Sequence, residues 1–119
     1  MYYSPQQKAN SQYQQTQIMS ADPLQLLIMT YDYTIAGCRE RNLEKVNRGL
    51  QELMDNLNHD EGGQFAADLL SLYFYIADLA RHNQYDEASS LLRDLRNTWS
   101  QAREQMFRQQ PAPAMRIAA

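Results

Sequence analysis

Apolar residues recur every three or four positions through most of the chain, which is the spacing of residues on one face of an α-helix. The β-branched residues that favour strands are few, and Val46 is the only valine. The pattern predicts helices over about 23–40, 43–58, 65–82 and 85–107. Because the links between them are short, neighbouring helices must run antiparallel, so the sequence predicts an all-α, up-down four-helix bundle.

The start of the first helix has a strong sequence signal. Ser20 or Asp22 can cap the free N–H groups, and Pro23 stands where a proline in the first turn is tolerated. The run His59-Asp60-Glu61-Gly62-Gly63 interrupts the apolar pattern and predicts a break before the third helix.

Composition divides the chain into three parts. Residues 1–17 carry six glutamines and few apolar residues, so we interpret 1–19 as a flexible arm and a candidate lid. Prolines at 111 and 113 cannot continue a helix, so 109–119 is interpreted as a disordered tail. The bundle itself is expected over 20–108.

Length, charge and cysteine usage narrow the class of protein. A chain of 119 residues suits one domain, and a net charge of -3 has the wrong sign for binding a phosphate backbone. One cysteine and two histidines make neither an internal disulfide nor a standard zinc site, so no metal or cofactor is expected. The sequence shows neither a secretion signal nor an apolar run of about 18 residues, which predicts a cytoplasmic protein without membrane insertion.

The sequence also recurs at an offset of 42 residues. Matching or chemically similar pairs are Leu27/Leu69, Tyr31/Tyr73, Tyr33/Tyr75, Arg39/Arg81, Glu44/Asp86, Leu50/Leu92, Glu52/Asp94 and Leu53/Leu95. Either two similar hairpins compose the domain, or two helices share a heptad register, because 42 is six heptads. Both readings predict a matched break at Asn42-Leu43 and Gln84-Tyr85.

Two of the expected helices carry more apolar surface than one core requires. In the first, the core arc is Leu24, Leu27, Ile28, Tyr31, Ile35 and Cys38, while Leu26, Met29 and Tyr33 lie on the opposite side. In the third, Leu70 and Phe74, with Ala67 and Ala77, lie far from Phe65, Leu69, Leu72, Ile76 and Leu79. The second helix, by contrast, has one apolar face: Leu43, Val46, Leu50, Leu53, Met54 and Leu57. Because the first and third helices are diagonal in such a bundle, apolar surface should remain on two sides.

Three different segments could cover this apolar surface. The arm could fold back through Tyr13, Ile18 and Met19, a flexible partner segment could wrap the bundle, or a second copy could form a homodimer. The candidate partner-binding residues are Tyr13, Ile18, Met19, Leu26, Met29, Tyr33, Leu70 and Phe74.

The run from Ile18 to Asp32 resembles the opening of the flagellar secretion chaperones that hold flagellin, the FliS family. The shared features are a Ser-Ala-x-Pro cap, a Leu-Leu pair and a Tyr-Asp pair. Further agreement comes from Leu53–Asn58 with Gly62-Gly63, Leu72-Tyr73-Phe74-Tyr75 and Leu95-Arg96-Asn97-Thr98-Trp99, so the resemblance covers about 13–103. The chain departs from the family at Tyr33, where glycine is common, and over 32–58, which looks about four turns shorter.

The resemblance implies a function without chemistry. Members of this family bind the disordered C-terminal segment of flagellin, block its premature polymerisation in the cytoplasm, and deliver it to the flagellar type III export gate. Their N-terminal arm can occupy the partner's groove. The resemblance therefore implies a non-enzymatic chaperone of flagellum biogenesis without a cofactor. The alternative is a tetratricopeptide-like adaptor, although such repeats recur at about 34 residues rather than 42.

Other distinctive residues are expected to be structural. Cys38 should be a small buried apolar residue, and Trp99 a core anchor. His59 and His82 should lie near helix C-termini, where they meet free carbonyls. Tyr31 and Tyr73 should lie on the core side with their hydroxyls near a rim.

Overall fold

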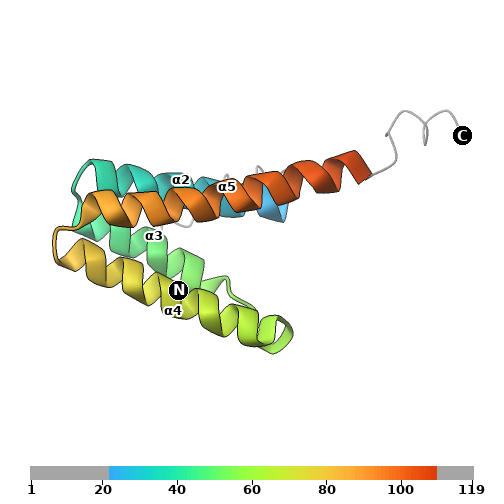
Figure 1. Ribbon diagram of the computed structural model, residues 1–119, viewed down its shortest axis with the longest axis horizontal. Coiled ribbons are helices and arrows are strands. Elements are labelled where there is room, and N and C mark those ends of the chain that lie inside the picture. Colours follow the sequence, from blue (N-terminus) through green and yellow to red (C-terminus); the bar gives the residue numbers. More distant parts are fainter. Residues whose placement is uncertain (1–21, 110–119) are drawn as a thin grey trace, which may run out of the picture.

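The computed structural model describes residues 22–109, which form four helices and the links between them (Figure 1). The helices are α2 (Pro23–Arg39), α3 (Leu43–Asp55), α4 (His59–Arg81) and α5 (Tyr85–Gln109). The predicted all-α four-helix fold is confirmed. The arm with Tyr13, Ile18 and Met19, the alternative cap Ser20, and residues 110–119 of the predicted tail lie outside the described residues. The prediction that the tail begins at Gln109 is wrong, because Gln109 is the last residue of α5.

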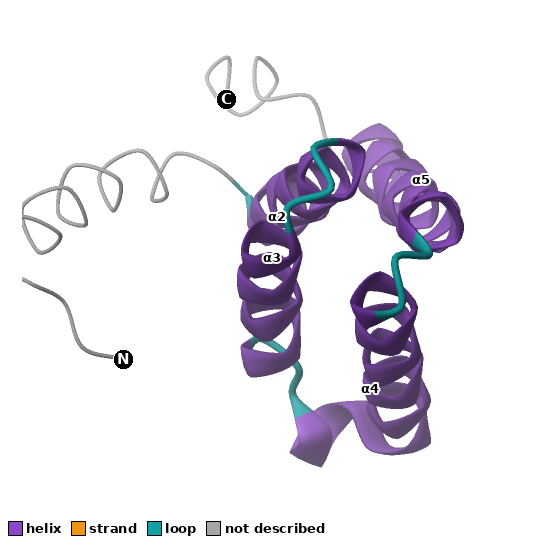
Figure 2. Cartoon of the chain, turned by 90° about the vertical axis from the view of Figure 1, so that its left-hand side faces the viewer, coloured by secondary structure: helices purple, strands orange, loops and turns teal. Residues whose placement is uncertain are grey.

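The helices pack around one centre in the up-down order that the short links require. Helix α2 packs on α3 and α5, and α4 packs on the same two neighbours. Figure 2 shows α2 and α4 at opposite corners of this arrangement. The two helices with extra apolar residues are therefore diagonal, as predicted.

Side-chain caps fix the start of three helices. Asp22 accepts a hydrogen bond from the Gln25 N–H at 2.9 Å, which confirms it as a cap of α2. Asn42 does the same for α3, with the Lys45 N–H at 3.1 Å. Asn58 caps α4 through the Glu61 N–H, also at 3.1 Å. These acceptors satisfy N–H groups that have no partner within the helix.

The predicted break over 59–63 is wrong in form. Helix α3 ends at Asp55 rather than near Asn58, and α4 begins at His59. The interruption is a kink at Gly63, where φ is 53° and ψ is -129°, a conformation that suits glycine. His59 is therefore the first residue of a helix and caps no C-terminus. His82 does stand at the end of α4, with Nδ1 2.8 Å from the Asp78 carbonyl oxygen.

Helices α2 and α3 approach closely because glycine faces threonine. A Cβ added to Gly49 would lie 1.9 Å from Oγ1 of Thr34. Thr34 is fully buried, and its hydroxyl donates to the Thr30 carbonyl oxygen at 2.8 Å. The contact leaves no room for a side chain at position 49. It thereby sets the spacing of the first hairpin.

The 42-residue recurrence extends to the backbone of the two hairpin turns. Arg41 and Asn83, 42 positions apart, both have positive φ, at 52° and 63°. The N–H groups of the following residues, Asn42 and Gln84, donate to the carbonyls of Gly37 and Leu79 at 2.9 and 2.8 Å. The next helices begin at Leu43 and Tyr85, so the predicted matched break is confirmed.

Candidate functional site

The outer face of α2 carries exposed apolar side chains. Met29 is 56% exposed and Tyr33 is 37% exposed, while Leu26 beside them is partly buried. Their spacing places them on one side of the helix, away from buried Tyr31 and Ile35. We call Leu26, Met29 and Tyr33 the α2 face.

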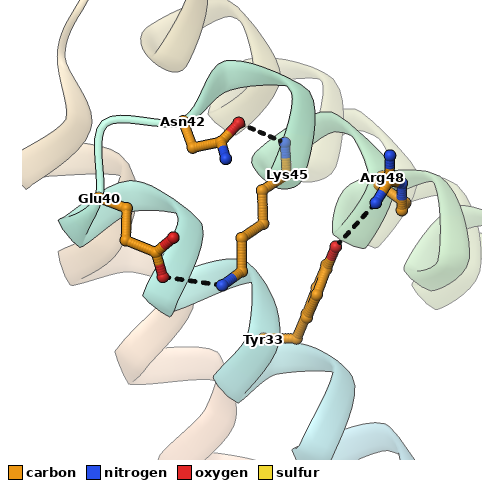
Figure 3. Close-up of polar contacts among 5 residues, drawn as sticks. All are labelled: Tyr33, Glu40, Asn42, Lys45 and Arg48. Atoms are coloured by element: carbon orange, nitrogen blue, oxygen red, sulfur yellow. Dashed lines mark hydrogen bonds and ion pairs between the residues drawn. The ribbon is translucent and has the colours of Figure 1, made fainter.

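Charged residues of α3 hold Tyr33 in place at one edge of the α2 face (Figure 3). Arg48 Nη1 donates to the Tyr33 hydroxyl at 3.4 Å, and Lys45 Nζ lies 5.1 Å from the centre of its ring. Lys45 is itself paired with Glu40 at 2.7 Å. The aromatic ring is thus supported from one side by cations and remains accessible from the other.

Helix α4 presents a second apolar surface. Phe74 is 57% exposed, and Leu70, one turn before it, is partly buried. Ala67 is exposed as predicted, but Ala77 is buried, so its assignment to this surface is wrong. Ala77 lies one turn after buried Tyr73 and one turn before buried Ala80, which places it on the core-facing side of α4. We call Leu70 and Phe74 the α4 face. Because α2 and α4 are diagonal, the structure does not bring the two faces together.

A groove that the sequence pattern does not indicate opens at the end of the bundle where α2 and α4 begin. Its volume is about 320 Å³. All four helices contribute apolar lining residues, and the polar lining residues Asn56, Asn58 and Glu61 come from the link between α3 and α4 and the first turn of α4. The lining residues are Leu27, Leu53, Asn56, Leu57, Asn58, Glu61, Gly62, Phe65, Ala66, Leu69, Tyr73 and Trp99. We call this the end groove.

Phe65 and Trp99 form one wall of the end groove. Phe65 is 61% exposed, so its prediction as a core residue is wrong. Its ring meets Trp99 edge-on, with centroids 6.3 Å apart at 76°. Trp99 is partly buried and packs against the core while lining the groove. Because α3 has 13 residues and α4 has 23, the first turns of α4 lack a full-length neighbour, which leaves Phe65 uncovered within residues 22–109.

Two tyrosines lie beneath this wall. Trp99 Nε1 donates to the Tyr31 hydroxyl at 3.2 Å, and that hydroxyl is 2.6 Å from the hydroxyl of Tyr73. Burial raises the pKa of both tyrosines, most strongly at Tyr73, so both are neutral. The expectation that both hydroxyls lie near a rim is wrong, because both side chains are buried and bond to each other.

A smaller cavity lies where α2 begins beside α5. It has a volume of about 90 Å³ and is lined by Asp22, Leu24, Arg103, Met106 and Phe107. Arg103 pairs with Asp22 at 3.0 Å and lies 4.6 Å from the centre of the Phe107 ring. The pair ties the first residue described to the last turns of α5.

The exposed apolar residues of the described region suit it to binding another apolar surface. Burial raises the pKa of the Cys38 thiol to about 11, so it is protonated at neutral pH and is a poor nucleophile. Within residues 22–109, no three His, Cys, Asp or Glu side chains group as metal ligands, and none of the four helices is long and apolar enough to cross a membrane. Apolar faces and grooves of this kind bind protein segments.

Comparison with known protein families identifies the family of this chain. The family model described as "Flagellar protein FliS" matches residues 37–106, which is more than half of the chain. The matched stretch begins after the run from Ile18 to Asp32, so it supports the resemblance with a different part of the sequence. No curated protein and no solved structure matches the chain. The match covers the end of α2, all of α3 and α4 and most of α5, and it shows that the chain belongs to the FliS family of flagellar chaperones.

Proposed function

We propose that this protein is a cytoplasmic export chaperone that binds the disordered C-terminal segment of flagellin, prevents its premature polymerisation and delivers it to the flagellar type III export apparatus. Family membership supports the chaperone role. The observation that carries the proposal for this chain is the exposed apolar surface on two diagonal helices: Met29 and Tyr33 on α2, and Phe74 on α4.

The position of these faces favours a flexible client. A rigid globular partner meets one side of a small bundle, whereas an extended segment can pass from the α2 face to the α4 face. Ordering such a segment costs several kcal/mol, so the net affinity should be moderate even with large buried area. Moderate affinity suits a chaperone that must release its client at the export gate.

The proposed mechanism needs no covalent step. The chaperone covers the apolar residues through which flagellin subunits would assemble, so bound flagellin cannot polymerise. Release then requires only that the gate or the growing filament compete for the same segment. A tetratricopeptide-like adaptor is disfavoured by the family match and by the 42-residue recurrence of the hairpins.

Two substitutions test the proposal on opposite sides of the bundle. Tyr33→Asp and Phe74→Asp each place a charge in an apolar contact on an exposed position, so the bundle should remain folded by circular dichroism. Each should weaken binding of the flagellin C-terminal segment about tenfold or more in calorimetric titration, the effect of losing one strong contact. Asn97→Asp, at an exposed polar position on α5, is the matched control and should change nothing.

Unchanged affinity in both variants would remove the two faces from the client site. A flagellin lacking its C-terminal segment should not shift the chaperone on size-exclusion chromatography, whereas intact flagellin should. Chromatography of the chaperone alone tests the remaining alternative, a homodimer that covers these faces.

A further inference from the structure

Ten of the twelve residues that line the end groove belong to a stretch of α3 and α4 with only one sign of formal charge. The other two are Leu27 and Trp99, and the arginines of α5 on either side of Trp99, Arg96 and Arg103, are paired with Asp32 and Asp22. Between Arg48 and Arg81 there is neither lysine nor arginine, whereas six residues are acidic: Glu52, Asp55, Asp60, Glu61, Asp68 and Asp78. Asp78 pairs with Arg81 at 3.0 Å, away from the groove at the other end of α4. The other five have no ion-pair partner within residues 22–109.

One of these five carboxylates lines the groove, and the other four lie within four residues of lining residues. Glu61 lines it directly. Asp55 precedes the lining residue Asn56, and Glu52 lies one turn earlier on the same side of α3, where its carbonyl oxygen accepts from Asn56 Nδ2 at 2.9 Å. Asp68 lies three residues after Phe65, on a neighbouring part of the α4 surface. An exposed aromatic wall is thus bordered by acids from two helices.

Helix stability explains only some of these acids. Asp60 and Glu61 stand in the first turn of α4, where negative charge is favourable. Glu52 and Asp55 stand in the last turn of α3, and this turn contains no basic residue. Negative charge at the C-terminal end of a helix opposes the helix dipole. Asp55 has a partner within α3, because Gln51 Nε2 donates to its Oδ1 at 2.8 Å. The Glu52 carboxylate has no ion pair within residues 22–109 to offset its unfavourable position, which points to a role outside the fold.

We propose that the end groove is a second docking site, separate from the α2 and α4 faces, for a cationic amphipathic segment of another protein. A large apolar side chain of that segment would occupy the space beside Phe65 and Trp99. Lysine or arginine residues one turn away on either side would meet the carboxylates of Glu52, Asp55 and Glu61. Charge of one sign around an apolar anchor gives both affinity and selection against acidic partners.

The chain's own segments are a poor match to this chemistry. Residues 1–21 contain one cationic side chain, Lys8, and residues 110–119 contain one, Arg116. Five carboxylates call for more positive charge than either supplies. A second copy brings the same acidic border and would repel it. Charge complementarity therefore favours a different protein.

Peptide binding to the full chain tests this site. The probes are two fluorescein-labelled amphipathic peptides of about 14 residues, four helical turns, with the same leucine face and either lysine or glutamate opposite. The lysine peptide should bind and the glutamate peptide should not, as measured by fluorescence anisotropy. Binding should weaken as salt rises. Trp99, the only tryptophan, should change its emission when the groove is filled.

Matched variants separate the groove from general attraction to an acidic protein. Phe65→Ser should weaken the lysine peptide about tenfold, whereas Phe74→Ser, on the same helix at similar exposure, should not. The pair Glu52→Gln with Asp55→Asn should weaken it more than Glu87→Gln with Asp94→Asn, exposed acids of α5. Equal binding of the two peptides, or equal effects of the variants and their controls, would overturn the proposal.

Competition with the client distinguishes this inference from the proposed function. The flagellin C-terminal segment should not displace the lysine peptide, and its own affinity should be unchanged by Phe65→Ser. Displacement with loss of flagellin binding in Phe65→Ser would assign the groove to the client and overturn a second site, while the chaperone function would stand. A dimer of the chain that dissociates in Phe65→Ser would likewise overturn it.

Discussion

The hydroxyl groups of Tyr31 and Tyr73 lie 2.6 Å apart across the centre of the bundle, and the two residues are separated by 42 positions. They belong to the diagonal helices α2 and α4, so the bond joins the first hairpin to the second. Both side chains are almost completely buried. Residues that are equivalent in two repeats meet each other when the repeats pack about a local two-fold axis. The bond therefore gives the sequence recurrence a structural meaning.

Removing either hydroxyl should have unequal effects. Tyr31→Phe leaves the buried Tyr73 hydroxyl and the Trp99 N–H without their partner, and should cost about 2–3 kcal/mol of unfolding free energy. Tyr73→Phe preserves the bond from Trp99 to Tyr31 and should cost about 1 kcal/mol. Urea unfolding measures both values. The exposed Tyr75→Phe is the control, and equal losses in the two buried variants would contradict this account.

A side chain at position 49 should push α2 and α3 apart. Gly49→Ala places a Cβ 1.9 Å from Thr34 Oγ1, and overpacking of this kind costs about 1–3 kcal/mol. The added Cβ would also lie 2.8 Å from Thr34 Cβ and 3.2 Å from its backbone Cα, so rotation of the hydroxyl does not relieve the clash. The cost should therefore exceed the gain of about 1 kcal/mol that alanine brings to a helix interior. Thermal unfolding should show a lower midpoint for Gly49→Ala. Asn47→Ala, at an exposed position of α3, receives the helix gain alone and should not be destabilised.

Much of the fold can be predicted from helical periodicity and from capping residues, because both depend on residues close together in the sequence. The spacing of Val46, Leu50 and Leu53 places them on one side of α3, and all three are buried. The cap at Asp22 and the matched starts at Leu43 and Tyr85 depend on a few neighbouring residues. The end of α3 was harder to predict, because Leu57 continues the apolar spacing although the helix has already ended at Asp55. Periodicity does not distinguish a last helical turn from a packed link.

The candidate site depends on distances between helices, which periodicity does not contain. The outward positions of Met29, Tyr33 and Phe74 could be predicted, since each lies opposite a core stripe. The end groove could not, because Phe65 continues the core stripe of α4 and is left uncovered only by the shorter neighbour α3. The sequence analysis did not predict the acidic border, although the stretch from 49 to 80 contains neither lysine nor arginine. Only the structure shows that these acidic residues lie near the groove that Phe65 and Trp99 line.

Asp22 has two separable roles at the start of α2. Burial alone would raise its pKa, but hydrogen bonds from the Gln25 N–H and Arg103 and the charge of Arg103 hold the pKa below 3.8. A lowered pKa means that its contribution to stability is present above pH 3.8 and is lost as the pH falls further.

Asp22→Ser keeps a cap but not the ion pair, and Asp22→Ala removes both. Urea midpoints at pH 7 should fall in the order wild type, Asp22→Ser, Asp22→Ala, and the differences should shrink in acid. Equal midpoints for the two variants would show that the cap contributes nothing.

Cys38 should make the protein sensitive to alkaline pH. Burial raises its pKa from 9.0 to about 11, so between these values the unfolded chain releases the thiol proton while the folded chain retains it. Since the folded state then binds more protons, stability falls as pH rises from 9.0 to about 11, by up to about 2 kcal/mol from this group. Tyr31 and Tyr73 lower stability further above pH 10, because burial raises their pKa values too. Cys38→Ala places at position 38 the residue found at the equivalent position, buried Ala80, and removes only the thiol contribution. Urea unfolding at pH 8 and pH 10.5 should therefore show a smaller loss for Cys38→Ala than for the wild type, and iodoacetamide should label native Cys38 far more slowly than the unfolded chain. Equal losses in both proteins, or rapid labelling of the native state, would mean that the thiol reaches solvent.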